Sequence, residues 1–268
     1  MSAESQDLLT IAMEAARAAG QLLASREGRV QVAETKSSPT DVVTEMDRQA
    51  EALIRSLILD SRPGDAILGE EGGQTGSAPV RWVIDPLDGT VNYLYGLHDW
   101  AVSIAAEVSG EVVAGVVAVP HRGETFTATV GGGAWLNSRA GRVALRCNTG
   151  VPLDQALVAT GFGYRAERRA AQGEIVAALL PRIRDIRRGG AAAVDLCSVA
   201  AGRVDAFYER GLNYWDYAAG GLIAAEAGAV VGGLSGAPAS TSMTVAAAPD
   251  LFRQLAGLLA GMDAERDS

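Results

Sequence analysis

The sequence has few cysteines, few histidines and no long apolar run, and each shortage excludes a class of protein. Its two cysteines, Cys147 and Cys197, lie far apart, so we expect neither a disulfide scaffold nor a Cys-rich zinc site and predict a reducing cytoplasm. His98 and His121 are too far apart for a two-histidine metal motif at helical spacing. Residues 1–28 lack a basic start and are interrupted by charges, so we expect neither a signal peptide nor a membrane span there.

Positive charge is also scarce. The chain has 23 Lys and Arg residues against 32 Asp and Glu residues, which gives a formal net charge of −9. Nucleic acid and anionic membranes would be repelled by such a surface, so neither is a predicted partner. If the substrate is itself an anion, bound cations would have to offset the charge.

The composition is that of a folded protein of ordinary type. Of the 268 residues, 48% are hydrophobic and 21% are charged, enough to bury a large core in one domain or in two packed halves. Gly-separated strand patterns dominate up to about residue 145, and strands alternate with helices after residue 150. We therefore predict an α/β protein with two halves, residues 1–147 and 148–268.

Periodicity predicts the main elements. Apolar residues at helical spacing indicate helices over residues 1–28 and 44–64, the second capped by Thr44. A strand over residues 80–85 is expected to end at Asp85, because the residue before Pro86 favours extended geometry. Further predicted strands cover residues 100–108, 111–120, 124–130, 156–164 and 204–209, with a Gly-rich hairpin at 131–137. Further predicted helices cover residues 174–186 (interrupted at Pro181), 191–202 and 215–228.

Several carboxylates stand where strands end or helices begin, and each has an ordinary structural interpretation. Asp88 before glycine is a turn signal. Asp216 suits a helix N-cap, and Asp47 is close to a capping box with Thr44. Glu70 and Glu71 could simply be solvated charges on a loop.

Their joint occurrence favours a metal site. In layered α/β proteins, strand ends and helix starts gather at one edge, where ligands bind. Four acidic groups there would repel one another unless cations neutralised them, and all-oxygen ligands favour magnesium, manganese or calcium over zinc. The candidate ligands are Glu70, Asp85, Asp88 and Asp216. The backbone N–H groups of Gly89 and Thr90 follow a tight turn and could bind a phosphate, so the pattern predicts a phosphatase.

Four segments resemble the sequence motifs of the inositol monophosphatase family. "WVIDPLDGTVNY" resembles its Asp-Pro-x-Asp-Gly-Thr motif, and "NYWDYAAGG" its Trp-Asp-x-Ala-Ala-Gly motif. "GEEGG" resembles the Glu-Glu loop, and "KSSPTDVVTEMD" the segment before it. The order and spacing hold from about residue 5 to residue 260. The resemblance, which is greatest to bacterial members, implies a layered αβαβα sandwich of the inositol monophosphatase/fructose bisphosphatase type. It also implies a magnesium-dependent, lithium-sensitive phosphomonoesterase that forms a homodimer.

The resemblance also implies roles for particular residues. Two or three Mg²⁺ ions are expected, with Mn²⁺ as a substitute. The first would be held by Glu70, Asp85 and the carbonyl of Leu87. The second would be held by Asp85, Asp88 and Asp216, and Glu70 would hold a third, weaker ion through water. The catalytic residues would be Asp47 and Thr90, which orient the attacking water, together with Glu70.

On the substrate side, the resemblance implies that Glu209 and the backbone N–H near Ala192 bind the hydroxyls of a polyol. The predicted substrate-binding residues are Asp88, Gly89, Thr90, Ala192, Glu209 and Asp216. The predicted substrate is a small phosphate ester, first of all myo-inositol-1-phosphate. Histidinol phosphate, fructose-1,6-bisphosphate and 3′-phosphoadenosine 5′-phosphate remain alternatives, because the metal motifs do not separate them. A metal-binding dimeric interaction module without turnover is the alternative from another class.

Overall fold

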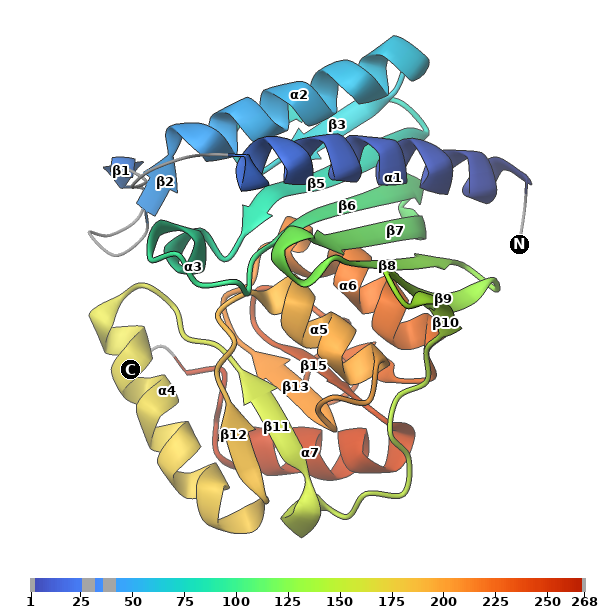
Figure 1. Cartoon of the computed structure of the whole chain (residues 1–268). Helices are drawn as coiled ribbons and strands as arrows, with labels where there is room; N and C mark the ends of the chain where they lie inside the picture. Colours follow the sequence, from blue (N-terminus) through green and yellow to red (C-terminus); the bar gives the residue numbers. More distant parts are fainter. Residues whose placement is uncertain (1–2, 26–31, 36–41, 267–268) are drawn as a thin grey trace.

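Two mixed β-sheets with helices between and outside them form the framework of the protein (Figure 1). The computed structural model describes residues 3–25, 32–35 and 42–266. The larger sheet has the strand order β10-β9-β8-β7-β6-β5-β3-β4, and the smaller has the order β12-β11-β13-β15-β14. A separate hairpin pairs β1 (Val32–Thr35) with β2 (Val42–Thr44). The segment "KSSPTDVVTEMD", which resembles a family motif, covers residues 36–47. Its first half, residues 36–41, lies outside the described residues.

The strands have the following bounds. Those of the larger sheet are β3 (Ala66–Gly69), β4 (Gly73–Thr75), β5 (Val80–Asp88), β6 (Ala101–Val108), β7 (Glu111–Val119), β8 (Glu124–Thr129), β9 (Gly133–Ser138) and β10 (Gly141–Ala144). Those of the smaller sheet are β11 (Leu157–Thr160), β12 (Asp185–Arg187), β13 (Ala206–Glu209), β14 (Val230–Gly232) and β15 (Thr244–Ala247).

The helices form three layers around these sheets (Figure 1). The outer pair on the larger sheet is α1 (Ala3–Ala24) and α2 (Glu45–Ser61). The pair between the sheets is α5 (Ala192–Ala200) and α6 (Tyr214–Glu226). The outer pair on the smaller sheet is α4 (Ala166–Leu179) and α7 (Pro249–Gly261). A short helix, α3 (Thr90–Leu94), follows β5. No helix in the described part of the chain is long and apolar enough to cross a bilayer.

Alternating side chains on each strand explain the layering. On β5, Trp82 and Ile84 pack against α1 and α2, whereas Val83 packs against α5 and α6. On β13, Phe207 faces the central helices and Tyr208 faces the outer ones. Because neighbouring residues on a strand point to opposite faces, apolar runs of this kind need helices on both sides. The αβαβα sandwich implied by the resemblance is confirmed.

The two predicted halves share a core. β10 ends at Ala144 and β11 begins at Leu157, yet helix α6 of the second half packs on the sheet of the first. Gly115 on β7 permits this approach, because a Cβ atom there would lie 3.1 Å from the Cα of Ala219 on α6. The division at residues 147 and 148 stays a prediction.

Several element boundaries differ from those expected. Strand β5 does not end at Asp85 but continues through Pro86 to Asp88, with an irregular register against β6 between the two aspartates. A bulge of this kind accommodates a residue that has no N–H to donate. Helix α4 begins at Ala166, earlier than predicted, and ends before Pro181, where the interruption was expected.

Candidate active site

The segment from Asp85 to Thr90 folds back on itself at the end of β5. Oδ1 of Asp85 accepts a hydrogen bond from the N–H of Leu87 at 3.0 Å. The carbonyl oxygen of Leu87 accepts one from the hydroxyl of Thr90, also at 3.0 Å. Asp85 is only 2% exposed. The turn therefore holds a buried carboxylate, a carbonyl and a hydroxyl close together at one sheet edge.

Gly89 permits this turn. Its φ of 87° lies in the left-handed region, which favours glycine. A Cβ atom at this position would also lie 2.9 Å from the carbonyl oxygen of Asp99 and 3.1 Å from Cβ of Ala191. The residue between Asp88 and Thr90 must therefore be glycine for reasons of both backbone conformation and space.

Asp88 lies at the N-terminus of α5. Its Oδ1 accepts the N–H of Ala192 at 3.2 Å, and its Oδ2 accepts the N–H of Ala193 at 2.7 Å. The first amides of a helix have no acceptor within the helix, and its N-terminus favours a negative charge. The Ala192 N–H predicted to contact substrate therefore donates to Asp88 in this structure, so a substrate hydroxyl would have to share it.

Asp216 lies at the third position of α6 and is not its N-cap, contrary to the structural interpretation made from sequence. The cap is Asn213, whose N–H donates to Oδ2 of Asp216 at 2.7 Å. This half of a capping box orients the carboxylate along the start of the helix. The residue as a whole is partly exposed, but its carboxylate group is buried within the site.

Tyr214, two residues before Asp216, ties the first turn of α6 to the larger sheet. Its hydroxyl donates to Oε2 of Glu107 on β6 at 2.9 Å, and Arg81 on β5 donates to the same oxygen at 2.8 Å. Glu107 is buried. The contact fixes where the helix carrying Asp216 begins.

We predict that Tyr214→Phe lowers the free energy of unfolding by about 1–3 kcal/mol, because it removes a donor from a buried carboxylate. Tyr217→Phe is the matched control, since its hydroxyl makes only a 3.3 Å contact with the carbonyl oxygen of Ala239. Urea unfolding measures both variants. Equal losses in the two variants would contradict the anchoring role of Tyr214.

Glu51 on α2 holds the loop that carries Glu70. Its carboxylate accepts the N–H groups of Glu71 at 2.8 Å and Gly72 at 2.9 Å, and it pairs with Arg55 at 2.7 Å. A Cβ atom at Gly69 would lie 2.4 Å from Oε1 of Glu51, so the glycines flanking the loop leave room for this carboxylate. In sequence, Glu51 and Arg55 form an i,i+4 pair typical of an exposed helix face, and this is why Glu51 was missed.

Asp47 and Thr90 are in contact. The Thr90 hydroxyl lies 3.0 Å from Oδ1 of Asp47, while Oδ2 of Asp47 accepts the N–H of Thr44 at 2.9 Å. Thr44 caps α2 as predicted, and Asp47 completes the capping box. Burial raises the pKa of Asp47, although hydrogen bonds from Thr44 oppose the shift. One carboxylate thus starts a helix and also faces the turn.

The predicted ligands influence one another electrostatically. Burial raises the pKa of Asp85 well above its ordinary value, and the charges of Glu70, Asp88 and Asp216 raise it further, as does a hydrogen bond with Glu70. Burial raises the pKa of Asp88 to about 7 against the opposing effect of the α5 amides. Burial and then Glu70 raise the pKa of Asp216. A cation placed among these groups would relieve the repulsion.

A second acidic pair, Asp195 and Glu209, lies close enough to Asp88 for the charges to interact. Burial raises the pKa of Glu209 to about 8, and Asp195 adds to the shift while Arg188 opposes it. Burial, followed by the charge of Asp88, raises the pKa of Asp195 to about 7. Asp195 is a further candidate that the sequence did not reveal, because it reads as an ordinary first-turn helix acid.

Gly161 makes room for the Glu209 side chain. A Cβ atom there would lie 2.1 Å from Oε2 of Glu209, so the carboxylate crosses the end of the neighbouring strand β11.

A magnesium ion fits the chemistry of the predicted ligands Glu70, Asp85, Asp88 and Asp216, although these side chains are not already arranged around a metal position. Among residues 3–25, 32–35 and 42–266, no three His, Cys, Asp or Glu side chains are arranged as a ready ligand group. Both oxygens of Asp88 face α5, and one oxygen of Asp85 faces Leu87. The charges of Glu70, Asp85, Asp88 and Asp216 nevertheless act on one another across this edge of the sheet. Their all-oxygen character and negative charge suit Mg²⁺.

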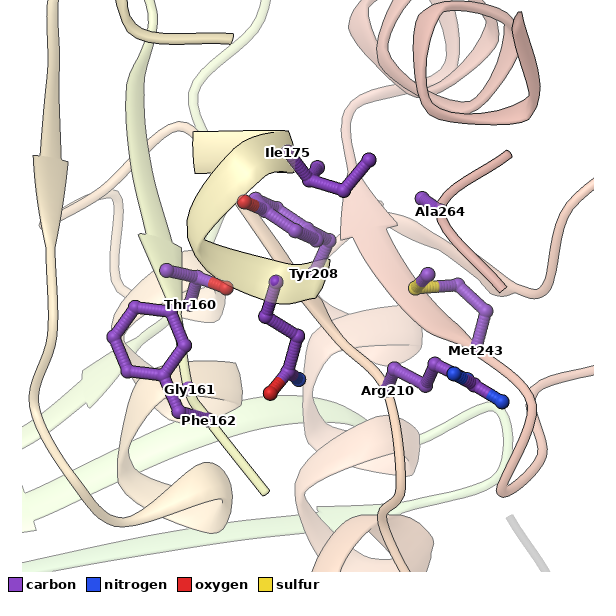
Figure 2. A pocket seen from close by; sticks show the side chains of 9 residues that line it. Thr160, Gly161, Phe162, Ile175, Tyr208, Arg210, Met243 and Ala264 are labelled. Carbon is purple, nitrogen blue, oxygen red and sulfur yellow. The ribbon is translucent and has the colours of Figure 1, made fainter. Parts of the chain in front are cut away.

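Two cavities are lined by residues other than the predicted metal ligands. The one in Figure 2 lies beneath α4 and beside the ends of β11 and β13, and its volume is about 10 Å³. It has room for about one water molecule. A larger hollow of about 340 Å³ lies between α1 and the β7–β8 connection. Its lining residues are Met13, Ala16, Arg17, Gly20, Gln21, Ala24, Ala118, Pro120, Gly123, Glu124 and Thr125. Neither cavity contains the predicted ligands.

Comparison with known proteins gives consistent matches over most of the chain. A model of the inositol monophosphatase family matches residues 4–262. The inositol-1-monophosphatase SuhB of Mycobacterium tuberculosis is 49% identical over 231 residues, which cover 84% of this chain and 80% of that protein. The Nus factor SuhB of Escherichia coli is 44% identical over 233 residues, covering 85% and 86%.

A solved structure agrees with these matches. The structure of Mycobacterium tuberculosis SuhB superposes with a TM-score of 0.84 at 43% identity, covering 99% of this chain and 100% of that one.

Proposed function

The chain belongs to the inositol monophosphatase family, and from that premise we propose that it is a magnesium-dependent phosphomonoesterase that hydrolyses myo-inositol-1-phosphate to inositol and inorganic phosphate. The observation that carries the proposal is the turn after β5, which holds the carboxylate of Asp85, the carbonyl of Leu87 and the contact between Thr90 and Asp47 together at one sheet edge. The similarity to a protein named inositol-1-monophosphatase supports the choice of substrate.

We assign the metal ligands as the sequence motifs imply. Glu70, Asp85 and the carbonyl of Leu87 would hold one Mg²⁺, and Asp85, Asp88 and Asp216 a second, with Glu70 available to a third through water. Bound Mg²⁺ would lower the pKa of a water molecule toward neutrality and offset charge on the phosphate and the leaving oxygen. Glu51 keeps the Glu70 loop in place for this task.

Thr90 and Asp47 would orient the attacking water and accept its proton. The one proton of the Thr90 hydroxyl lies within reach of two acceptors, Oδ1 of Asp47 and the carbonyl oxygen of Leu87, each at 3.0 Å. When it is donated to Asp47, the Thr90 oxygen can accept a hydrogen bond from the water. As the water attacks phosphorus, its proton would pass to the Thr90 oxygen while the Thr90 proton passes to Oδ1 of Asp47. Burial raises the pKa of Asp47, which makes it a better base.

The amides that open α3 would bind phosphate oxygens, and the second acidic pair would bind the alcohol. The carbonyl of Gly89 accepts the N–H of Tyr93 at 3.0 Å, so the N–H groups of Gly89 and Thr90 stand at the helix start, where an anion is favoured. Carboxylates accept hydrogen bonds from neighbouring hydroxyls. Glu209 and Asp195 would therefore select a polyol.

A panel of phosphate esters tests the proposal. Phosphate release is measured from myo-inositol-1-phosphate, histidinol phosphate, fructose-1,6-bisphosphate and 3′-phosphoadenosine 5′-phosphate, each with magnesium and with chelator. We expect magnesium-dependent release with the highest kcat/KM for inositol phosphate. A higher kcat/KM for another ester would refute the inositol assignment, and release from none of them would refute the phosphatase.

We also propose that the protein is a homodimer. Tyr95 and Leu97, in the loop after α3, are 76% and 56% exposed, and His98 stacks on His121 beside them with ring centroids 4.7 Å apart. Exposed apolar groups that cluster in this way commonly mark an interface.

Leu97→Asp is expected to shift the protein from dimer to monomer in size-exclusion chromatography with light scattering. Dimer formation would bury the unpaired charge of the new aspartate at the interface, which is unfavourable. Val143→Asp, a similarly exposed position at 57%, is the control and should leave the dimer intact. A monomeric wild-type protein, or a dimeric Leu97→Asp variant, would contradict the assignment.

Three further expectations remain proposals. Both cysteines are free and buried, which supports the cytoplasm as compartment. Lithium is expected to inhibit the phosphatase, and Mn²⁺ to replace Mg²⁺.

The similarity to a protein named Nus factor favours a second candidate function, an interaction role that would not need turnover. Retention of a binding partner by a variant without phosphatase activity would support that role.

A further inference from the structure

The buried hydroxyl of Ser103 on β6 makes no hydrogen bond in the described part of the chain that would explain why a polar side chain stands at this position. Ser103 is 1% exposed, and its Oγ has no hydrogen-bond partner among the described residues. Buried hydroxyls in folded proteins are nearly always paired, because an unpaired one loses its hydrogen bonds to water. Alanine would fill the same strand position without this cost. The hydroxyl is therefore expected to have a partner in the working protein.

The sheet register puts Ser103 beside Asp85. The two residues are direct partners in the antiparallel pairing of β5 and β6, and side chains of such partners share a face with Cβ atoms about 4.5–5.5 Å apart. On β6, Ala101 and Ala105 face the layer of α5 and α6. Ser103, two positions from each, points the same way. This is the layer from which α6 brings Asp216.

We propose that Ser103 is a positioning residue whose hydroxyl donates to the carboxylate of Asp85 when Mg²⁺ is bound, holding an oxygen of that carboxylate toward the ion. This rests on the proposed function. Asp85 already accepts the N–H of Leu87 on Oδ1, and a second donor from the opposite strand fixes the rotation of the carboxylate. Hydrogen bonds to metal ligands commonly change metal affinity about 10–100-fold.

Magnesium titration of the substrate-free protein tests this directly. Ser103→Ala is expected to raise the calorimetric Kd for Mg²⁺ about tenfold. Ser198→Ala is the matched control: Ser198 is also buried, but its hydroxyl donates to the carbonyl of Val194 within α5 at 2.8 Å. The control should keep the wild-type Kd. Ser103→Thr, which retains the hydroxyl, should keep it as well.

Thermal unfolding separates positioning from a structural role. In chelator, Ser103→Ala is expected to have a Tm equal to or above that of the wild type, because the unpaired hydroxyl is gone. The increase in Tm on adding Mg²⁺ should be smaller than in the wild type. A lower Tm in chelator would instead indicate a structural partner.

Two results would overturn the proposal while leaving the proposed function intact. One is an unchanged Kd for Mg²⁺ in Ser103→Ala with an unchanged KM for the phosphate ester, which would leave the hydroxyl without a role in metal binding. The other is an unchanged Kd with a raised KM at saturating Mg²⁺, which would assign the hydroxyl to the substrate. A wild-type protein that binds no Mg²⁺ would refute the proposed function, and the role of Ser103 with it.

Discussion

Asp88→Asn is expected to lower turnover by several orders of magnitude while the chain still folds. The change removes the negative charge at the point where the proposed metal ligands meet the α5 N-terminus, and metal ligands control such reactions strongly. The Asn side chain retains one acceptor for the amides of Ala192 and Ala193 but turns a donor toward the other. We therefore expect stability to fall by about 1–3 kcal/mol.

Steady-state phosphate release and urea unfolding measure the two effects of Asp88→Asn. Asp154→Asn is the control, since it makes the same chemical change at an exposed position in the turn Leu153–Gln155. It should match the wild type in both measurements. Near-normal turnover in Asp88→Asn would end the assignment of Asp88 to a second metal ion.

Asp47→Asn is expected to lower kcat by about 10²–10⁴-fold, the usual contribution of a positioned base. The variant removes the carboxylate that faces the Thr90 hydroxyl and weakens the start of α2. The loss of stability should be about 1 kcal/mol, as for other helix caps. Phosphate release at saturating substrate and Mg²⁺ measures the loss of kcat.

Thr44→Val separates the two roles of Asp47. It removes the capping hydroxyl, which accepts the N–H of Met46 at 3.2 Å and donates to Oδ2 of Asp47 at 2.5 Å, but it leaves in place Oδ1 of Asp47, the oxygen that faces the Thr90 hydroxyl. We expect a similar loss of stability with a much smaller loss of kcat. If Thr44→Val lost as much kcat as Asp47→Asn, the role of Asp47 would be structural.

The sequence allowed the layers and many candidate residues to be predicted, because they depend on local signals. Helix α2 and its cap follow from Thr44 and the apolar spacing, and the hairpin of β8 and β9 follows from its glycines. The resemblance of four short segments implied the sandwich, and the structure confirms it. The proposed metal and substrate roles of these residues remain predictions.

Other features depend on distant contacts and left no local signal. The strand β15 is rich in alanine, which has weak β propensity, and its conformation is fixed by pairing with β13 and β14. Asp195 becomes part of the site only because α5 points its first turn at Asp88. Ser103 looks like any small residue on a strand until the register with Asp85 is known.

The most direct test of the account is restoration of metal-stripped protein with Mg²⁺. Calorimetry and phosphate release from myo-inositol-1-phosphate would be recorded on the same preparation as Mg²⁺ is added back. We predict no turnover in the stripped protein and turnover that rises with the fraction of protein that has Mg²⁺ bound. Full turnover in the stripped protein with chelator present would contradict a metal-dependent site built on Glu70, Asp85, Asp88 and Asp216.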